Sequence, residues 1–247
     1  DRLKDVLSDP EAFLSELTRS ESGPLALKVS IERAGPQLQS RLQPHMSTYG
    51  LTWADVAPAL AEHVRQKAAP DGVHGGFASI AAQMAEVRRA CEDAAATLRI
   101  LTAEGGPLAQ KALVHELRPK LEQPLTPKMR LLDGLSWEEV APELEQLTDL
   151  RTLRTKSAAA VNKYVQEKLG RPLFIAAIRK RVGPTLQPWM DEHGLTYTDV
   201  MPRLVSRGEP LYGATELDEV EAACTPPDGP DLVFAELLAE RKAALDP

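Results

Sequence analysis

Apolar residues recur along the chain at helical spacing, and one amphipathic stretch appears three times. The copies are residues 50–60, 134–144 and 194–204, and the first is identical to either of the others at seven of eleven positions. In each copy an aromatic residue, a valine and a leucine stand at i, i+3 and i+7, which places them on one face of a helix. The pattern predicts three buried faces, formed by Trp53, Val56 and Leu60; Trp137, Val140 and Leu144; and Tyr197, Val200 and Leu204.

The residues that flank these faces predict where each helix begins. A Thr or Ser opens each copy and an acid follows three residues later, as in Ser136 and Glu139. This spacing is typical of a capping box, in which the two side chains satisfy free backbone amides. A Gly precedes each hydroxyl residue by two positions and suits the left-handed end of a preceding helix. A Pro at the sixth helical position (Pro58, Pro142 and Pro202) has no amide, so we expect each copy to bend or restart there.

The duplication extends beyond the repeated stretch. Residues 23–46 and 106–129 align without a gap and share ten of twenty-four positions. The corresponding third segment is four residues shorter, a loss of about one helical turn. Prolines in these segments predict turns of short helices before each capped helix. No alternating strand pattern occurs. The expected fold class is therefore all-α, with three tandem related helical units in a short helical array, connecting helices between them and no sheet.

Seven segments follow from this interpretation. They are an N-terminal helix at 1–22, unit 1 at 23–76, a connecting helix at 77–105, unit 2 at 106–147, a connecting helix at 148–169, unit 3 at 170–206 and an acidic C-terminal helical tail at 207–247. The first connecting helix is expected to run continuously from 77 to about 102. The tail is expected to contain a short helix near 215–223 and a final helix from 230 to about 245.

Composition narrows the class of protein. No apolar run approaches the roughly 18 to 20 residues that a membrane-spanning helix needs, so a soluble protein is expected. The chain begins at Asp1 without a targeting pattern. This start fits a processed product, for example after import into an organelle, or an excised piece. The sequence does not identify the cellular compartment. Cys91 and Cys224 stand far apart, and free thiols are favoured over a single bridge between them.

Charge is unevenly distributed in a chain whose formal net charge is −7. The last forty residues hold ten acids and two bases, whereas residues 151–181 hold nine bases and one acid, Glu167. We expect this basic segment to contact an acidic protein or an anionic membrane surface. In the alternative, the acidic C-terminal helix folds back over it. Binding to nucleic acid is disfavoured, because Tyr164 and Phe174 are the only aromatic residues among the basic residues of this segment. The candidate partner-binding residues are Arg151, Arg154, Lys156, Lys163, Lys168, Arg171, Arg179, Lys180 and Arg181.

Catalytic, metal-binding and cofactor-binding patterns are not found. The five histidines lack metal-ligand spacing, and Asp191, Glu192 and His193 are interpreted as an exposed helix end. We therefore predict no enzyme activity, metal or cofactor. The favoured function is an interaction protein, an accessory, scaffold or linker subunit that binds other protein subunits in a larger assembly. Two alternatives are a nucleic-acid-associated protein and a carrier of an apolar small molecule or pigment, held between units by Trp53, Trp137 and Tyr197.

Overall fold

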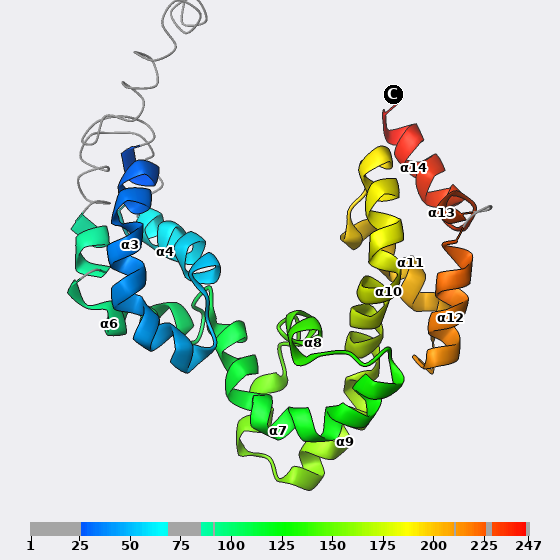
Figure 1. Cartoon of the computed structure of the whole chain (residues 1–247), viewed down its shortest axis with the longest axis horizontal. Helices are drawn as coiled ribbons and strands as arrows, with labels where there is room; N and C mark the ends of the chain where they lie inside the picture. The colour runs from blue at the N-terminus through cyan, green and yellow to red at the C-terminus, as the bar shows by residue number, and fades with distance from the viewer. Residues whose placement is uncertain (1–25, 69–84, 91, 210, 226–228, 246–247) are drawn as a thin grey trace, which may run out of the picture. The chain divides into compact units, whose positions relative to one another are not determined.

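The computed structural model describes residues 26–68, 85–90, 92–209, 211–225 and 229–245. Within these ranges every regular element is a helix and none is a strand, so the predicted all-α class is confirmed (Figure 1). The chain divides into two compact units, Asp1–His115 and Glu116–Pro247. The finer division into three tandem units stays a prediction. The predicted N-terminal helix at 1–22, the end of unit 1 at 69–76 and the start of the first connecting helix at 77–84 lie outside the described residues.

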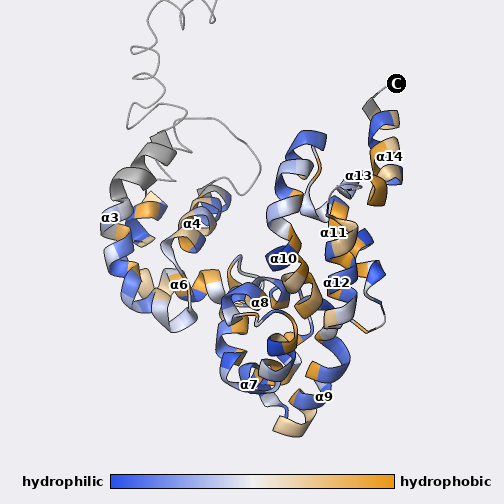
Figure 2. Ribbon diagram, turned by 45° about the vertical axis from the view of Figure 1, so that its right-hand side comes forward, coloured by the Kyte–Doolittle hydropathy of each residue, from blue (hydrophilic) through white to orange (hydrophobic). Residues whose placement is uncertain are grey.

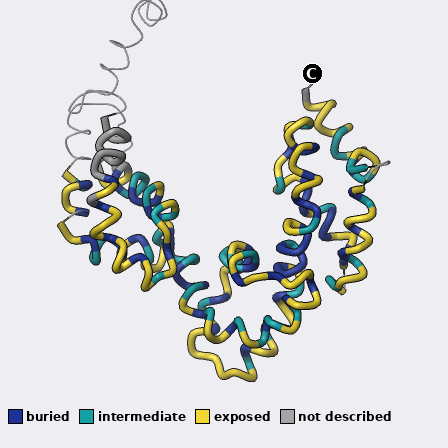
Figure 3. Tube along the Cα trace, in the orientation of Figure 1, coloured by how far each residue is buried: buried dark blue, intermediate teal, exposed yellow. Residues whose placement is uncertain are grey.

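In the first unit, α3 (Ala26–Met46) packs against α4 (Trp53–Ala68) and α6 (Ala94–Thr102), and η1 (Ser47–Tyr49) links α3 to α4. Burial along these helices is concentrated on the sides that face one another (Figure 3). The core contains six side chains with no exposed surface, namely Leu38, Leu42, Val56, Leu60, Leu98 and Leu101. Burying each such leucine contributes about 1.5–3 kcal/mol, so this shared face holds the unit together.

The predicted continuous helix from 77 to 102 is wrong at Asp93. Residues 85–90 and 92 are helical, but Asp93 leaves the helical conformation with φ −126° and ψ 72°. Its carboxylate accepts the Ala96 amide at 2.9 Å and so caps α6. An aspartate side chain competes with the helical backbone for hydrogen bonds, and here the cap prevails over continuation.

In the second unit, α10 (Gly170–His193) is the central element and packs against α8 (Trp137–Leu144), α9 (Ala158–Lys168), α11 (Tyr197–Arg207) and α12 (Ala214–Ala223). It carries both apolar and polar residues (Figure 2), and Phe174, Ile178 and Leu186 are fully buried. The remaining elements are the end of α7 (Ala109–Leu131), η2 (Leu150–Thr155), α13 (Gly229–Val233) and α14 (Ala235–Leu245). The helix predicted near 215–223 is confirmed as α12, but the predicted final helix is interrupted at Phe234, which is buried against Trp189 with ring centroids 5.1 Å apart.

Prolines do not divide the long helices. The prediction of short helices separated by turns is wrong, because α3, α7 and α10 each continue through two or three prolines. Nor do α4 and α11 restart at Pro58 and Pro202. A buried stripe at i+4 spacing explains the continuity of α7, because only an unbroken helix keeps all of its members in the core. Its members are Leu113, Leu117, Leu121, Leu125 and Met129, each 6% exposed or less. The three prolines of α7 cost roughly 3 kcal/mol each, or about 9 kcal/mol together, and burial of five apolar side chains at about 1.5–3 kcal/mol each is large enough to offset that cost.

The repeated stretch has the predicted local structure. Trp53, Trp137 and Tyr197 are the first residues of α4, α8 and α11, and the valine and leucine of every copy are fully buried. Ser136 and Glu139 form a complete capping box. The aromatic residues differ, however: Trp137 is buried, whereas Trp53 and Tyr197 are half-buried. The buried valine and leucine therefore define the shared face, and the aromatic ring lies at its margin.

The turn before the second copy contains one extra residue. In the first and third copies the leucine amide reaches back five residues, from Leu51 to Met46 O at 3.0 Å and from Leu195 to Met190 O at 2.8 Å. In the second copy Leu135 reaches back six residues to Met129 O at 2.9 Å. The additional residue places Asp133 at φ 57° beside Gly134 at φ 60°. Aspartate tolerates this left-handed conformation better than most residues.

Candidate functional site

The basic segment 151–181 extends over η2, α9 and the first half of α10, and its last three cations are bound inside the second unit. Arg179 contacts Glu143, with Nη1 2.8 Å from Oε1, and its guanidinium lies 5.4 Å from the centre of the Tyr197 ring. Glu143 is only 7% exposed. Burial raises its pKa, and the charge of Arg179 opposes that shift. Arg179 therefore compensates a carboxylate that water barely reaches.

Lys180 holds the turn that precedes α8. Its Nζ donates to the Gly134 carbonyl at 3.2 Å and to Glu139 Oε2 at 3.1 Å. The Ser136 amide donates to the same Glu139 oxygen at 2.7 Å. This backbone bond, with help from Lys180, lowers the pKa of Glu139. Lys180 thus supports the capping box of the second copy.

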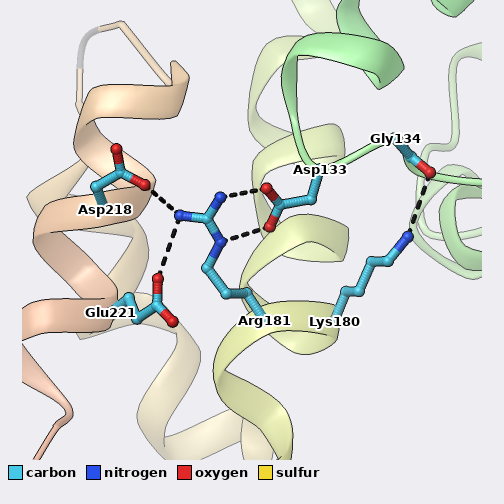
Figure 4. A network of polar contacts seen from close by, with 6 residues as sticks. All are labelled: Asp133, Gly134, Lys180, Arg181, Asp218 and Glu221. Atoms are coloured by element: carbon cyan, nitrogen blue, oxygen red, sulfur yellow. Dashed lines mark hydrogen bonds and ion pairs between the residues drawn. The ribbon is translucent and has the colours of Figure 1, made fainter.

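Arg181 joins three elements in one ion-pair network (Figure 4). It donates through Nε and Nη2 to both carboxylate oxygens of Asp133, with the Nε bond at 2.5 Å. Its Nη1 also binds Asp218 and lies 3.4 Å from Glu221, both on α12. The hydrogen bond from Arg181 lowers the pKa of Asp133. Asp218 and Glu221 belong to α12, whereas the predicted acidic C-terminal helix corresponds to α14, whose Glu236 and Glu240 pair with Arg203 outside the basic segment. The alternative that the C-terminal helix folds back over the basic segment stays a prediction.

The earlier cations of the segment have different surroundings. Arg154 binds Glu116 at 2.5 Å, and Lys163 lies 3.8 Å from Glu167 on the same helix. Lys156, Lys168 and Arg171 are exposed and form no ion pair with any carboxylate in the described part of the chain. Arg151 is half-buried and engaged in a contact of its own. The nine candidate residues therefore do not form one uniform surface.

A groove of about 760 Å³ lies between α7 and α9 in the second unit, next to Lys156. Two further lysines, Lys120 and Lys128, span from α7 to the opposite wall. Lys120 donates to the carbonyls of Leu153 and Arg154, and Lys128 donates to those of Val165 and Gln166 at 3.3 and 3.4 Å. Partial burial lowers the pKa of Lys128. The described lining residues are Pro119, Lys120, Gln123, Pro124, Pro127, Lys128, Lys156, Ala158, Val161, Asn162, Val165 and Gln166, and none of them is an acid.

Sequence reasoning missed Lys120 and Lys128, because they lie outside the basic segment and look like ordinary surface lysines of a helix. Their spacing of eight residues, together with three prolines on the same helix, was the available signal. It also missed that a cation binds each repeated helix at its first turn or in the turn before it. Lys111 contacts Asp55 at 2.6 Å, Lys180 binds the second turn, and Arg241 donates to the Gly194 carbonyl at 3.2 Å.

The repeated aromatic residues were the candidate contacts for an apolar ligand. Neither the groove between α7 and α9 nor a smaller one of about 190 Å³ beside α4 and α6 is lined by Trp53, Trp137 or Tyr197. The guanidinium of Arg118 lies 5.4 Å from the centre of the Trp137 ring and contacts Glu122 at 3.1 Å. Two of the three rings thus lie against an arginine.

Groups suited to chemistry are sparse among the described residues. No three His, Cys, Asp or Glu residues in these ranges are placed to hold a metal ion. His193 lies 3.3 Å from Asp231 and packs on Trp189, whereas His74 and Cys91 fall outside the described residues. Cys224 is buried as a free thiol, and burial raises its pKa to about 11. At neutral pH this thiol is protonated and a poor nucleophile.

No described helix combines the length and the apolar character that crossing a bilayer requires. Comparison of the chain with protein-family models, with the sequences of curated proteins and with solved structures finds no match in any of the three.

Proposed function

We propose that this protein is a non-enzymatic helical adaptor, an accessory, scaffold or linker subunit that binds an acidic partner protein through its second unit. The observation that supports this most is the division within the basic segment. Arg179, Lys180 and Arg181 neutralise carboxylates of their own chain, whereas Lys156, Lys168 and Arg171 are exposed without a described acidic partner. Exposed unpaired cations attract an acidic surface over a long range and orient its approach.

The carrier alternative gains no comparable support. It requires an enclosed apolar space beside the repeated aromatic residues, and the two grooves described above are lined by other side chains. Ligand pockets are generally lined by apolar and aromatic side chains, whereas half of the described residues that line the larger groove are lysines or amides and none is aromatic. The adaptor function therefore accounts for more of the observed geometry.

Native mass measurement with charge-reversed variants tests the proposal. The protein recovered gently from a cell extract is expected in species heavier than the 27.0 kDa chain. Reversal of Lys156, Lys168 and Arg171 to Glu should shift it toward the free chain. The matched control reverses Arg88, Arg130 and Lys242, which are also exposed, by the same total charge. A lone 27.0 kDa species in the extract, or equal losses in both variants, would reject the proposal.

A further inference from the structure

We propose that the groove between α7 and α9 binds an extended acidic segment of a partner protein, with Lys120, Lys128 and Lys156 as its cationic contacts. This inference rests on the proposed adaptor function and specifies where the partner binds. It is carried by three properties of the groove: its charge, its shape and the hydrogen-bonding groups on its walls.

Charge complementarity identifies the sign of the ligand. Three lysines and no acid stand among the described residues that line the groove. Lys120 and Lys128 donate to backbone carbonyls, which leaves their charges without a carboxylate partner. An ammonium group has three donors and each of these lysines uses two, so one donor remains for a ligand. A carboxylate that entered the groove would be the first anion there.

Shape favours an extended chain. Lys120 and Lys128 lie eight residues apart on α7, which separates their backbone positions by roughly 12 Å at about 1.5 Å per residue. An extended strand advances about 3.3 Å per residue, so carboxylates four residues apart span about 13 Å. Proline rings on α7 and the short side chains of Val161 and Val165 on α9 leave the space between the two lysines open. Acids on one side of an extended segment therefore match the two lysines.

Hydrogen-bonding groups on the walls suit a polypeptide backbone. Pro124 and Pro127 have no amide, so the carbonyls four residues earlier, on Lys120 and Gln123, lose their ordinary helical donor. Both residues line the groove, together with the amide side chains of Asn162 and Gln166. A bound segment could pair its own amides and carbonyls with these groups, which a phosphate or a simple anion could not do as fully.

The test uses the 247-residue chain and a fluorescein-labelled probe of four Glu-Val repeats, and fluorescence anisotropy measures the binding of the probe. We expect saturable binding that weakens at least tenfold when the glutamates of the probe are replaced by glutamine. Asn162→Trp and Gln166→Trp should each weaken binding at least tenfold by filling the groove. Ala159→Trp is the matched control, because Ala159 is exposed on the same helix but does not line the groove. The affinity of this control for the probe should stay within twofold of the parent value. Circular dichroism serves to check that all three variants fold.

Three results would overturn the inference: equal binding of the glutamate and glutamine probes, equal weakening by Ala159→Trp, or tenfold tighter binding of an octathymidylate than of the glutamate probe. These results are distinguishable from failure of the adaptor proposal. If the charge-reversed variant loses its natural partner while the groove-filling variants retain it, the adaptor function stands and the groove is not the site. If the 247-residue chain binds no partner in the extract, the adaptor proposal fails irrespective of the peptide probe.

Discussion

Two parts of the same basic segment differ in whether carboxylates of the same chain bind their cations. Arg179, Lys180 and Arg181 come from one run of sequence on α10, and all three bind carboxylates from elsewhere in the second unit. Lys156 between η2 and α9, Lys168 at the end of α9 and Arg171 at the start of α10 lie exposed without such partners in the described part of the chain. The first group acts on stability, and the second is available to another molecule. A count of charges along the chain cannot separate the two.

The largest expected effect comes from Arg181→Ala. The arginine side chain is 19% exposed and binds Asp133, Asp218 and Glu221, so its loss leaves three acids near one another without their cation. Hydrogen bonds to charged groups each contribute about 1.5–3 kcal/mol, and solvent near α12 reduces the total. We expect the free energy of unfolding to fall by about 2–3 kcal/mol, measured by urea denaturation at pH 7.

Lys168→Ala is the control for that substitution, because Lys168 is an exposed cation of the same segment. Its free energy of unfolding should stay within about 0.5 kcal/mol of the parent value. If Arg181→Ala changed the free energy of unfolding as little as this control does, the contrast between bound and free cations would not hold.

Arg179→Ala should lower the free energy of unfolding by about 1–2 kcal/mol at pH 7, less than Arg181→Ala does. The reason is that the arginine is 46% exposed, although its partner Glu143 is buried. Burial raises the pKa of Glu143 above its ordinary value of 4.5. A carboxyl with a raised folded-state pKa favours folding below its unfolded value, and this contribution is lost as pH rises through the folded value. The deficit of the variant should therefore shrink as pH falls toward 4.5.

The double variant Arg179→Ala with Glu143→Gln isolates this pair. Because glutamine carries no charge, the pH dependence should disappear, and the double-mutant cycle reports the coupling between the two side chains. A deficit that is unchanged between pH 7 and the ordinary pKa of Glu143 would show that lost packing of Arg179, and not its charge, is responsible.

Asp133→Asn should lower the free energy of unfolding by about 1 kcal/mol. This is less than for the loss of Arg181, because Asp218 and Glu221 still bind the arginine. Asparagine also tolerates the left-handed conformation of this residue. Arg181 lowers the pKa of Asp133 below its ordinary 3.8, so this carboxyl stabilises the fold above that value and ceases to do so as pH falls through the lowered one. Acid unfolding curves of the two proteins should converge in this window. Asp133→Ala should lower the free energy of unfolding more than Asp133→Asn does. The reverse order would contradict the idea that asparagine fits the left-handed backbone conformation better than alanine.

The local structure of the repeated stretch was predictable because short-range chemistry determines it. A hydroxyl residue, an acid three residues later and a preceding glycine are enough to place the start of α8, and the buried Val140 and Leu144 follow from helical spacing. The all-α class follows from the same periodicity. These features depend on residues within about two helical turns of one another.

Features that depend on distant residues were not predictable. Proline rules suggested breaks in α7, but the buried i+4 stripe keeps the helix whole, and the balance depends on packing partners that the local pattern does not reveal. The cap formed by Asp93 is an exception, because it joins residues only three apart, but the continuous helical pattern around residue 93 concealed it. The groove requires knowledge that α7 and α9 lie side by side, so Lys120 and Lys128 had no recognisable role in the sequence.

The smallest expected effect on stability comes from Lys168→Ala combined with Arg171→Ala, and it gives the sharpest separation of the two groups of cations. Both residues are exposed without a described carboxylate partner, so the free energy of unfolding should change by less than about 0.5 kcal/mol. Affinity for an acidic partner should nevertheless fall, and the loss should diminish as salt rises from 0.05 to about 0.5 M, because salt screens exposed charges over roughly 10 Å or less. Native mass measurement across this salt series checks both points. An unchanged affinity at low salt would remove these two residues from the proposed surface, because an exposed cation that serves neither folding nor recognition is merely solvated.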